Sequence, residues 1–137
     1  MMNKREIANT LHEKGYNCAQ SVVCAFSEEL GVDKALLFRL TEGLGLGMGC
    51  TKGVCGALSA AVAAAGLKSS TAQLDNPTSK AATYDVAKAF TEEFEERAGS
   101  IICKELKGIN ARTPLCSCPE CIGIGVDILE KYLNNNK

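Results

Sequence analysis

The feature that most constrains the fold is a run of small apolar residues, VCGALSAAVAAAGL, from Val54 to Leu67. Its 14 residues are too few to span a bilayer. Alanine and glycine at this density let neighbouring helices approach closely, because the distance between helix axes depends on the side chains at the contact. The run therefore predicts a buried, Ala/Gly-rich central helix, with Gly66 as its C-terminal stop.

Other helices are predicted from apolar residues at helical spacing and from capping residues. The expected N-caps are Asn17, Asp33, Thr78 or Ser79, and Ser100. Pro119 suits the first turn of the last helix. The expected helices cover residues 18–30, 34–40, 54–67, 80–97, 100–106 and 119–133, after a short first helix. Because no alternating strand pattern of useful length is present, we predict an all-α fold: a single compact domain, residues 1–137, built as a bundle of about five or six helices.

Length and charge restrict the classes of partner. A chain of 137 residues is the size of one domain. Lys and Arg number 15 against 16 Asp and Glu, so the net charge is -1 and no basic excess is available for a nucleic-acid backbone. Residues 1–10 show no apolar run after their charges, so no signal peptide is visible. We therefore expect a cytoplasmic protein with no nucleic-acid partner and no membrane span.

Cysteine is the unusual component of the composition. The chain has eight cysteines, one histidine and no tryptophan. A single histidine excludes any metal site that needs two imidazoles from one chain, and a Cys–His catalytic pair would have to use His12. In a reducing compartment, a cysteine-rich chain is more often metal-binding or redox-active than held by structural disulfides. Thiols are therefore the expected reactive groups.

Four cysteines fall at expected helix starts: Cys18, Cys55, Cys103 and Cys121. A helix N-terminus carries free N–H groups and partial positive charge, which lower a thiol pKa. If the four starts converge, they suit an iron–sulfur cluster, a thiolate-bound metal or a reactive dithiol. The alternative is that these residues are small hydrophobic residues of the core.

The other four cysteines give weaker signals. Cys24 lies on the opposite helix face from the apolar stripe and is expected to be incidental. Cys50-x4-Cys55 and Cys116-x-Cys118-x2-Cys121 are spacings at which two ligands can share one metal. Neither spacing is specific for zinc or for a ferredoxin.

The glycine-rich stretch GLGLGMGCTKG, residues 43–53, lacks the glycine spacing of a nucleotide-binding loop. We expect its backbone to approach a bulky group closely and to offer N–H donors to sulfur. The candidate cofactor-binding residues are Gly47, Gly49, Gly53 and Gly56. A simple tight connection into the central helix is the alternative.

Three further side chains are considered: the single histidine, and two residues that lie near the expected thiol site in sequence. His12, on the first helix, is expected to face solvent or to have a packing role. Tyr16 and Lys52 are the two residues that could support a thiolate.

Four segments resemble a known family: KGYNCAQSV at 14–22, the glycine loop running into CGALSA at 55–60, GSIICKEL at 99–106, and Cys121 before the last helix. Together they resemble the C_GCAxxG_C_C family of redox-active proteins over nearly the whole chain. Its four characteristic cysteines match Cys18, Cys55, Cys103 and Cys121. Ala60 stands where the family's final motif glycine is found. The resemblance implies redox chemistry and a prosthetic group such as an iron–sulfur cluster.

Three functions fit these observations. The first is an iron–sulfur protein, ligated by the same four cysteines, for electron transfer or small-substrate redox chemistry with a redox partner protein. The second is a thiol–disulfide or sulfur-transfer oxidoreductase without metal, in which those cysteines are the redox thiols. The third is a structural zinc–thiolate module. The small-residue helix surfaces also permit a homo-oligomer.

Overall fold

The computed structural model describes residues 2–109 and 113–136 and is all-α. The elements are α1 (Lys4–Glu13), α2 (Cys18–Cys24), α3 (Ser27–Leu30), α4 (Lys34–Thr41), the 3-10 turn η1 (Glu42–Leu44), α5 (Gly45–Gly49), α6 (Gly56–Ser69), α7 (Lys80–Ala98), α8 (Cys103–Lys107) and α9 (Cys118–Asn135). Six of the described helices have seven or more residues, in agreement with the predicted bundle. Over the described ranges, the only extended pairing is an isolated antiparallel bridge between Val54 and Ile102.

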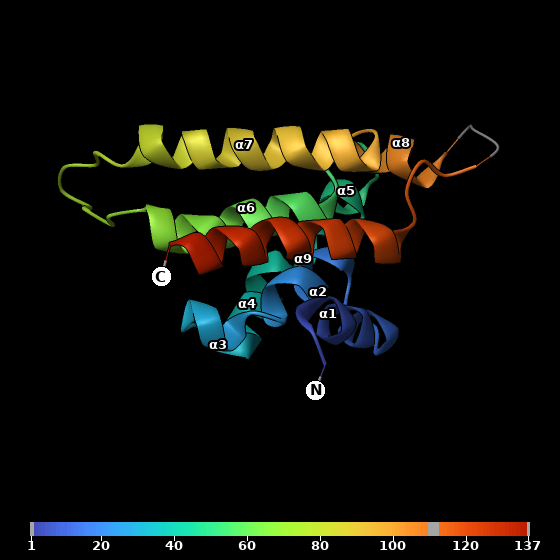
Figure 1. Ribbon diagram of the computed structural model, residues 1–137, viewed down its shortest axis with the longest axis horizontal. Coiled ribbons are helices and arrows are strands. Elements are labelled where there is room, and N and C mark those ends of the chain that lie inside the picture. The colour runs from blue at the N-terminus through green and yellow to red at the C-terminus, as the bar shows by residue number, and fades with distance from the viewer. Residues whose placement is uncertain (1, 110–112, 137) are drawn as a thin grey trace.

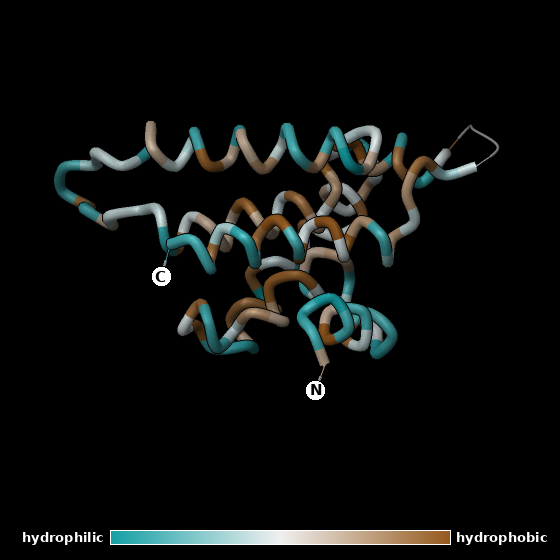
Figure 2. Tube along the Cα trace, in the orientation of Figure 1, coloured by the Kyte–Doolittle hydropathy of each residue, from teal (hydrophilic) through white to brown (hydrophobic). Residues whose placement is uncertain are grey.

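The helices lie in three levels around α6 (Figure 1). The long helix α7 forms one side, α6 and α9 lie side by side in the middle, and α1 to α4 form the other side. Helix α6 contacts α2, α7 and α9. Figure 2 shows the hydrophobic residues gathered along α2, α6 and α9, while the outer turns of α7 and most of α1 are hydrophilic. The predicted central helix is therefore confirmed.

Small residues let α6 and α9 approach closely. Ala57, Ala60, Ala61 and Ala64 on α6 are all at most 2% exposed. Opposite them, a Cβ added to Gly125 of α9 would lie 2.8 Å from the carbonyl oxygen of Ala57. The contact between these two helices therefore has no room for a methyl group at Gly125.

Two of the expected caps have the predicted geometry. The Asn17 side chain accepts a hydrogen bond from the N–H of Gln20, and the Gln20 side chain accepts one from the N–H of Asn17, which makes a capping box. The Asp33 side chain accepts from the N–H of Leu36 at the start of α4. At the C-terminal end of α7, Gly99 takes the left-handed conformation that ends the helix.

Other expected boundaries are wrong. Gly66 does not stop the central helix, which continues to Ser69, because Gly66 keeps a helical conformation and the chain becomes extended only at Ser70. The helix predicted over 18–30 is two helices, broken at Ala25 and Phe26. The side-chain oxygen of Ser100 accepts from the N–H of Ile102, so that helix begins three residues later than expected, at Cys103.

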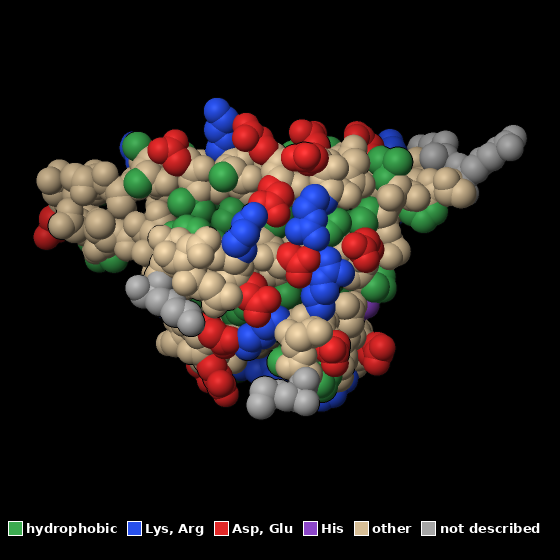
Figure 3. Space-filling view, viewed as in Figure 1, with side chains coloured by type: hydrophobic (Ala, Val, Ile, Leu, Met, Phe, Trp, Pro, Cys, Tyr) green, Lys and Arg blue, Asp and Glu red, His purple; other side chains and the backbone are tan. Residues whose placement is uncertain are grey.

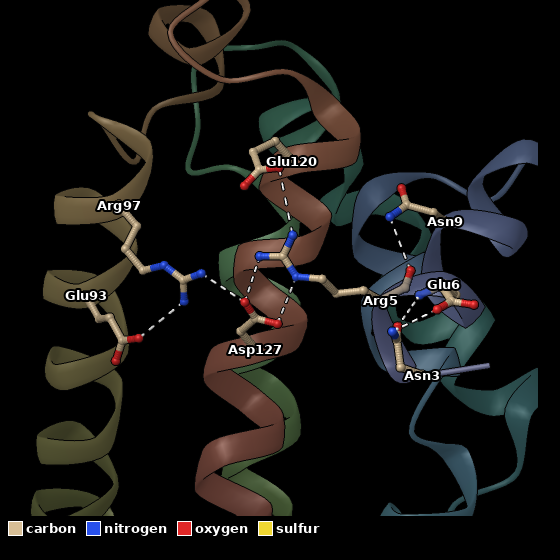
Figure 4. Close-up of polar contacts among 8 residues, drawn as sticks. All are labelled: Asn3, Arg5, Glu6, Asn9, Glu93, Arg97, Glu120 and Asp127. Carbon is tan, nitrogen blue, oxygen red and sulfur yellow. Dashed lines mark hydrogen bonds and ion pairs between the residues drawn. The ribbon is translucent and has the colours of Figure 1, made fainter. Parts of the chain in front are cut away.

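Charged side chains connect α1, α7 and α9 across one face (Figure 4). Asp127 on α9 accepts two hydrogen bonds from the Arg5 guanidinium, at 2.9 and 2.7 Å, and a third from Arg97 at 2.9 Å. Glu93 pairs with Arg97 and with Lys131. Figure 3 shows these positive and negative side chains alternating in a band over the face. The band lies at the surface, so it orients the three helices without requiring buried charge.

Across residues 2–109 and 113–136, no helix has the length and apolar character needed to cross a membrane.

We predict that Gly125→Ala lowers the free energy of unfolding by about 1–3 kcal/mol, because the added methyl group must displace the backbone of α6. Gly66→Ala is the matched control: its Cβ would meet nothing within 4 Å, and we expect it to raise that free energy by about 0.5–1 kcal/mol. Urea unfolding followed by circular dichroism measures both. A neutral Gly125→Ala would contradict the close approach of α6 and α9.

We also predict a specific acid sensitivity. The hydrogen bond from Arg5, and secondarily that from Arg97, lower the pKa of Asp127. The unfolded chain therefore binds this proton at a higher pH than the folded chain does. The stabilisation by Asp127 is complete above about pH 4, the unfolded-state value, and is lost as the pH falls through the lowered folded-state pKa.

Asp127→Asn is expected to lower stability at pH 7 and to flatten the acid limb of a plot of unfolding free energy against pH. Asp75→Asn, in the exposed connection between α6 and α7, is the control and should leave that limb unchanged. Parallel profiles for Asp127→Asn and the unaltered protein would contradict the proposed role of the ion pairs.

Candidate functional site

Six of the eight cysteines line one cavity of about 150 Å³. They are Cys18, Cys55, Cys103, Cys116, Cys118 and Cys121. The remaining lining residues are His12, Asn17, Leu46, Leu106 and Lys107. Most of the lining residues come from α5, α8 and the starts of α6 and α9, which gather toward the right-hand end of Figure 1. All eight cysteines are free thiols.

Four helix starts contribute to this cavity. Cys18 is the first residue of α2, Cys55 is the N-cap of α6, Cys103 is the first residue of α8, and Cys121 lies at the end of the first turn of α9. Three of the four are buried, and Cys18 is half-buried. The structure thus brings together the four cysteines that the sequence singles out.

Backbone hydrogen bonds fix the segments that carry Cys55 and Cys103. The N–H of Cys55 donates to the carbonyl oxygen of Ile101 at 2.7 Å, and the N–H of Cys103 donates to that of Gly53 at 3.0 Å. These two bonds flank the antiparallel bridge between Val54 and Ile102. The glycine-rich loop and the connection from α7 to α8 are therefore fastened together at the cavity.

The loop itself makes an unusual turn. Leu46, Gly47 and Met48 of α5 all have positive φ, between 56° and 64°, so this segment is a left-handed turn. For Leu46 and Met48, which carry a Cβ, this conformation costs about 1–2 kcal/mol each. The N–H of Thr51 donates to the carbonyl oxygen of Leu46 at 2.7 Å and stabilises the turn. Backbone strain of this kind persists where the surrounding structure requires it, and here it lies at the cavity wall.

Two of the four candidate glycines touch cysteines. A Cβ on Gly47 would collide with the Cβ of Cys103, and one on Gly56 would lie 2.6 Å from the Sγ of Cys18. The backbone of the loop and of α6 therefore reaches these cysteines only because glycine occupies both positions. The bulky groups that the loop approaches are the cysteines themselves.

The other two candidate glycines have different places. The carbonyl oxygen of Gly53 accepts the hydrogen bond from Cys103, and a Cβ there would lie 2.6 Å from the Met48 side chain. Gly49 is exposed, has a φ of 74°, and has no atom near its missing Cβ. Gly49 therefore provides a positive φ that the turn needs, and it does not touch the cysteines.

Burial and mutual contact raise the pKa values of the deep thiols. The pKa of Cys18 is raised, first by its hydrogen bond with Cys55 and then by burial, while N–H groups of Leu46 and Ala19 oppose the shift. The pKa of Cys55 is raised to about 12, first by its hydrogen bond with Cys121, with the contact to Cys18 opposing. Cys55 thus interacts with both Cys18 and Cys121.

The expected lowering of thiol pKa values at the helix starts is therefore wrong for Cys18 and Cys55, and also for Cys103, whose pKa is raised first by burial. The backbone donors are present, as the opposing effects of Leu46 and Ala19 show. Removal of the sulfurs from water, together with proton sharing between them, outweighs the helix N-termini.

A cation that the sequence analysis missed lies at the cavity. The Nζ of Lys107 is 3.4 Å from the Sγ of Cys118, and the pKa of Lys107 is raised first by negative charge on that sulfur. Lys107 is four residues after Cys103 on α8, so it returns to the same helix face. This i,i+4 spacing is the signal that could have identified it.

His12 also lines the cavity, although the sequence predicts a solvent-facing or packing role. Its Nδ1 lies 2.9 Å from the carbonyl oxygen of Tyr16, which can only accept, so Nδ1 carries the proton in the neutral ring. Tyr16 itself packs edge to face on Phe38, and Lys52 is exposed. Neither Tyr16 nor Lys52 lines the cavity, and no sequence pattern marks His12.

Two cysteines lie outside the cavity. Cys24 is 3% exposed in the core, where its thiol faces the carbonyl oxygen of Lys34 at 3.7 Å. Cys50 is exposed beside the left-handed turn. The spacing Cys50-x4-Cys55 therefore does not place both thiols in one cavity, whereas Cys116, Cys118 and Cys121 share it.

Among the side chains that the structure describes, no three from His, Cys, Asp and Glu are arranged to hold a single metal ion. A mononuclear ion draws its ligands into one tight tetrahedron. The described cavity cysteines do not provide such a set.

Comparisons with known proteins agree with the cysteine pattern. No curated protein and no solved structure matches the chain. A family model described as "Putative redox-active protein (C_GCAxxG_C_C)" matches residues 16–132, a range that includes all eight cysteines. The match covers most of the chain and confirms the resemblance given by its motifs. The chain therefore belongs to the C_GCAxxG_C_C family.

Proposed function

We propose that the cavity is a redox centre in which Cys18, Cys55, Cys103 and Cys121 hold an iron–sulfur cluster, for electron transfer or for redox chemistry on a small substrate. The observation that carries this proposal is the convergence of these four cysteines, from four separate helix starts, on one cavity. When bound, such a cluster supplies reversible one-electron transfer.

The raised pKa values of Cys18 and Cys55 support a ligand role. Neighbouring buried thiols cannot all lose their protons unless positive charge replaces them, because each thiolate raises the cost of the next. A bound metal provides that charge and deprotonates its thiols outright. The same raised values disfavour these residues as nucleophiles, which react as thiolates.

The spacing of the cysteines favours a cluster over zinc. Cluster ligands bond to different irons and so need not converge on one point, whereas structural zinc needs a closed tetrahedron. The described side chains contain no set of three suited to a single ion. All-thiolate ligation also fits a cavity with one imidazole.

The backbone around the cavity suits a sulfur-rich anionic centre. The N–H groups of Leu46 and Ala19 lower the pKa of Cys18, and that of Ala57 lowers the pKa of Cys55. Such donors adjust the potential of a thiolate-ligated cluster. In this proposal Gly47, Gly53 and Gly56 form the backbone that faces the cofactor, with Gly47 and Gly56 providing the close approach to Cys103 and Cys18.

The proposal includes a redox partner protein that docks at the open side of the cavity. It also includes a reducing compartment such as the cytoplasm, because all eight cysteines are free.

Metal and sulfide analysis tests the proposal. In protein purified without oxygen, we expect iron and matching acid-labile sulfide, both lost in Cys55→Ser because one of the four ligands is missing. Cys24→Ser is the matched control, since Cys24 is buried outside the cavity, and it should keep the iron and sulfide. Equal loss in both variants, zinc without sulfide, or no metal after reconstitution would overturn the cluster assignment.

Alkylation tests the ligand role by a separate route. Because the pKa of Cys55 is raised to about 12, its thiol is almost entirely protonated at pH 8 and reacts slowly. We expect iodoacetamide to modify Cys50, which is exposed, at least 100-fold faster than Cys55 in the reduced, metal-free protein. Mass spectrometry of peptides taken at intervals gives both rates. Comparable rates at the two positions would contradict the raised pKa of Cys55.

A further inference from the structure

The segment Cys118-Pro119-Glu120-Cys121 places two cysteines on the first turn of an 18-residue helix. Cys118 is the first residue of α9, and the Ser117 side chain caps the helix by accepting from the N–H of Glu120. In a regular α-helix, residues three apart have Cα atoms about 5 Å apart. That separation lies within the range that a disulfide bridges.

The two thiols differ in access. Cys118 is half-buried at the cavity, and Cys121 is 3% exposed inside it. A dissolved molecule therefore meets Cys118 first. The Lys107 ammonium, 3.4 Å from the Cys118 sulfur, offsets negative charge that forms there. Cys118 is thus placed to attack and Cys121 to resolve.

Cys121 also belongs to the proposed ligand set. Its thiol faces the carbonyl oxygen of Cys116 at 3.9 Å, and its sulfur lies near enough to Cys55 to affect that thiol. One sulfur cannot bond to Cys118 and to a metal centre at the same time. The chemical state of Cys118 therefore determines whether Cys121 is available as a ligand.

We propose that Cys118 and Cys121 form a thiol–disulfide pair that reacts with low-molecular-weight disulfides, and that the resulting Cys118–Cys121 disulfide withdraws Cys121 from the metal centre. The second half of this proposal rests on the proposed function, whereas the first half does not.

The reaction balances in two steps. The Cys118 thiol loses its proton to solvent, and its sulfur attacks one sulfur of the small disulfide, RSSR; the S–S bond breaks, a mixed disulfide forms, and one RS⁻ leaves and takes up a proton. The Cys121 sulfur, after losing its proton, then attacks the Cys118 sulfur and releases the second RS⁻. Two cysteine thiols are oxidised by two electrons, and one RSSR is reduced to two RSH.

Disulfide mapping tests the first half. Trypsin releases residues 113–131 as one peptide that holds Cys116, Cys118 and Cys121. After treatment of reduced, metal-free protein with oxidised glutathione and alkylation with N-ethylmaleimide, we expect this peptide to carry one label, on Cys116, and an internal Cys118–Cys121 disulfide. Cys116→Ser is the control and should keep that disulfide. A bond that includes Cys116, or three labelled thiols, would overturn the pair.

The role of Lys107 has its own readout. We expect Lys107→Gln to slow mixed-disulfide formation about two- to fivefold, as loss of a solvent-exposed charge pair would, and Lys107→Arg to restore most of the rate. An unchanged rate in Lys107→Gln would show that Lys107 does not assist the attack. The disulfide mapping alone would then decide whether Cys118 and Cys121 form a pair.

Metal uptake tests the second half. We expect protein oxidised beforehand with glutathione disulfide to take up less than a fifth of the iron and sulfide of reduced protein, with recovery after reduction, while Cys118→Ser takes up both after either treatment. Equal sensitivity of Cys118→Ser would overturn the gating. If no protein takes up metal, the proposed function fails, and the mapped disulfide still decides whether the pair exists.

Discussion

The candidate site depends on a backbone pairing between two segments that are far apart in the chain. The bridge between Val54 and Ile102, with the bonds from Cys55 to Ile101 and from Cys103 to Gly53, fixes two cysteines at one wall of the cavity. It also holds the end of the glycine-rich loop, whose left-handed turn closes over the same wall. Neither α6 nor α8 could point its first turn at the cavity without this connection, because each helix begins directly after it.

Charge is the second constraint on this site. Cys18 and Cys55 are stable as neutral thiols, because contact with neighbouring thiols and burial penalise the negative charge of the thiolates. The backbone donors reduce that cost without removing it. Cys118 is in a different situation, at the cavity edge beside the Lys107 ammonium. The cavity thus contains thiols suited to holding a cationic centre and one thiol suited to reaction with dissolved molecules.

Those features of the fold and of the site that have a local cause could be predicted from the sequence. The caps at Asn17 and Asp33 follow from side chains that reach their own helix starts, and the place of Cys18 follows from the cap at Asn17. The break after Cys24 and the role of Ser100 depend on tertiary context. The left-handed turn could not be predicted, because Leu46 and Met48 disfavour it and hydrogen bonds within the loop, from Thr51 and Gly53, hold it in place. The thiol pKa values depend on burial and on neighbours that only the fold supplies.

The order in which the chain is made has a consequence for this arrangement. The four family cysteines run from Cys18 to Cys121, and the bridge that orients two of them pairs residues on either side of the long helices α6 and α7. During synthesis the first two cysteines leave the ribosome well before the last two, and the cavity has no complete wall until α9 has started. Any centre built on all four cysteines is therefore loaded only after α9 has begun to form.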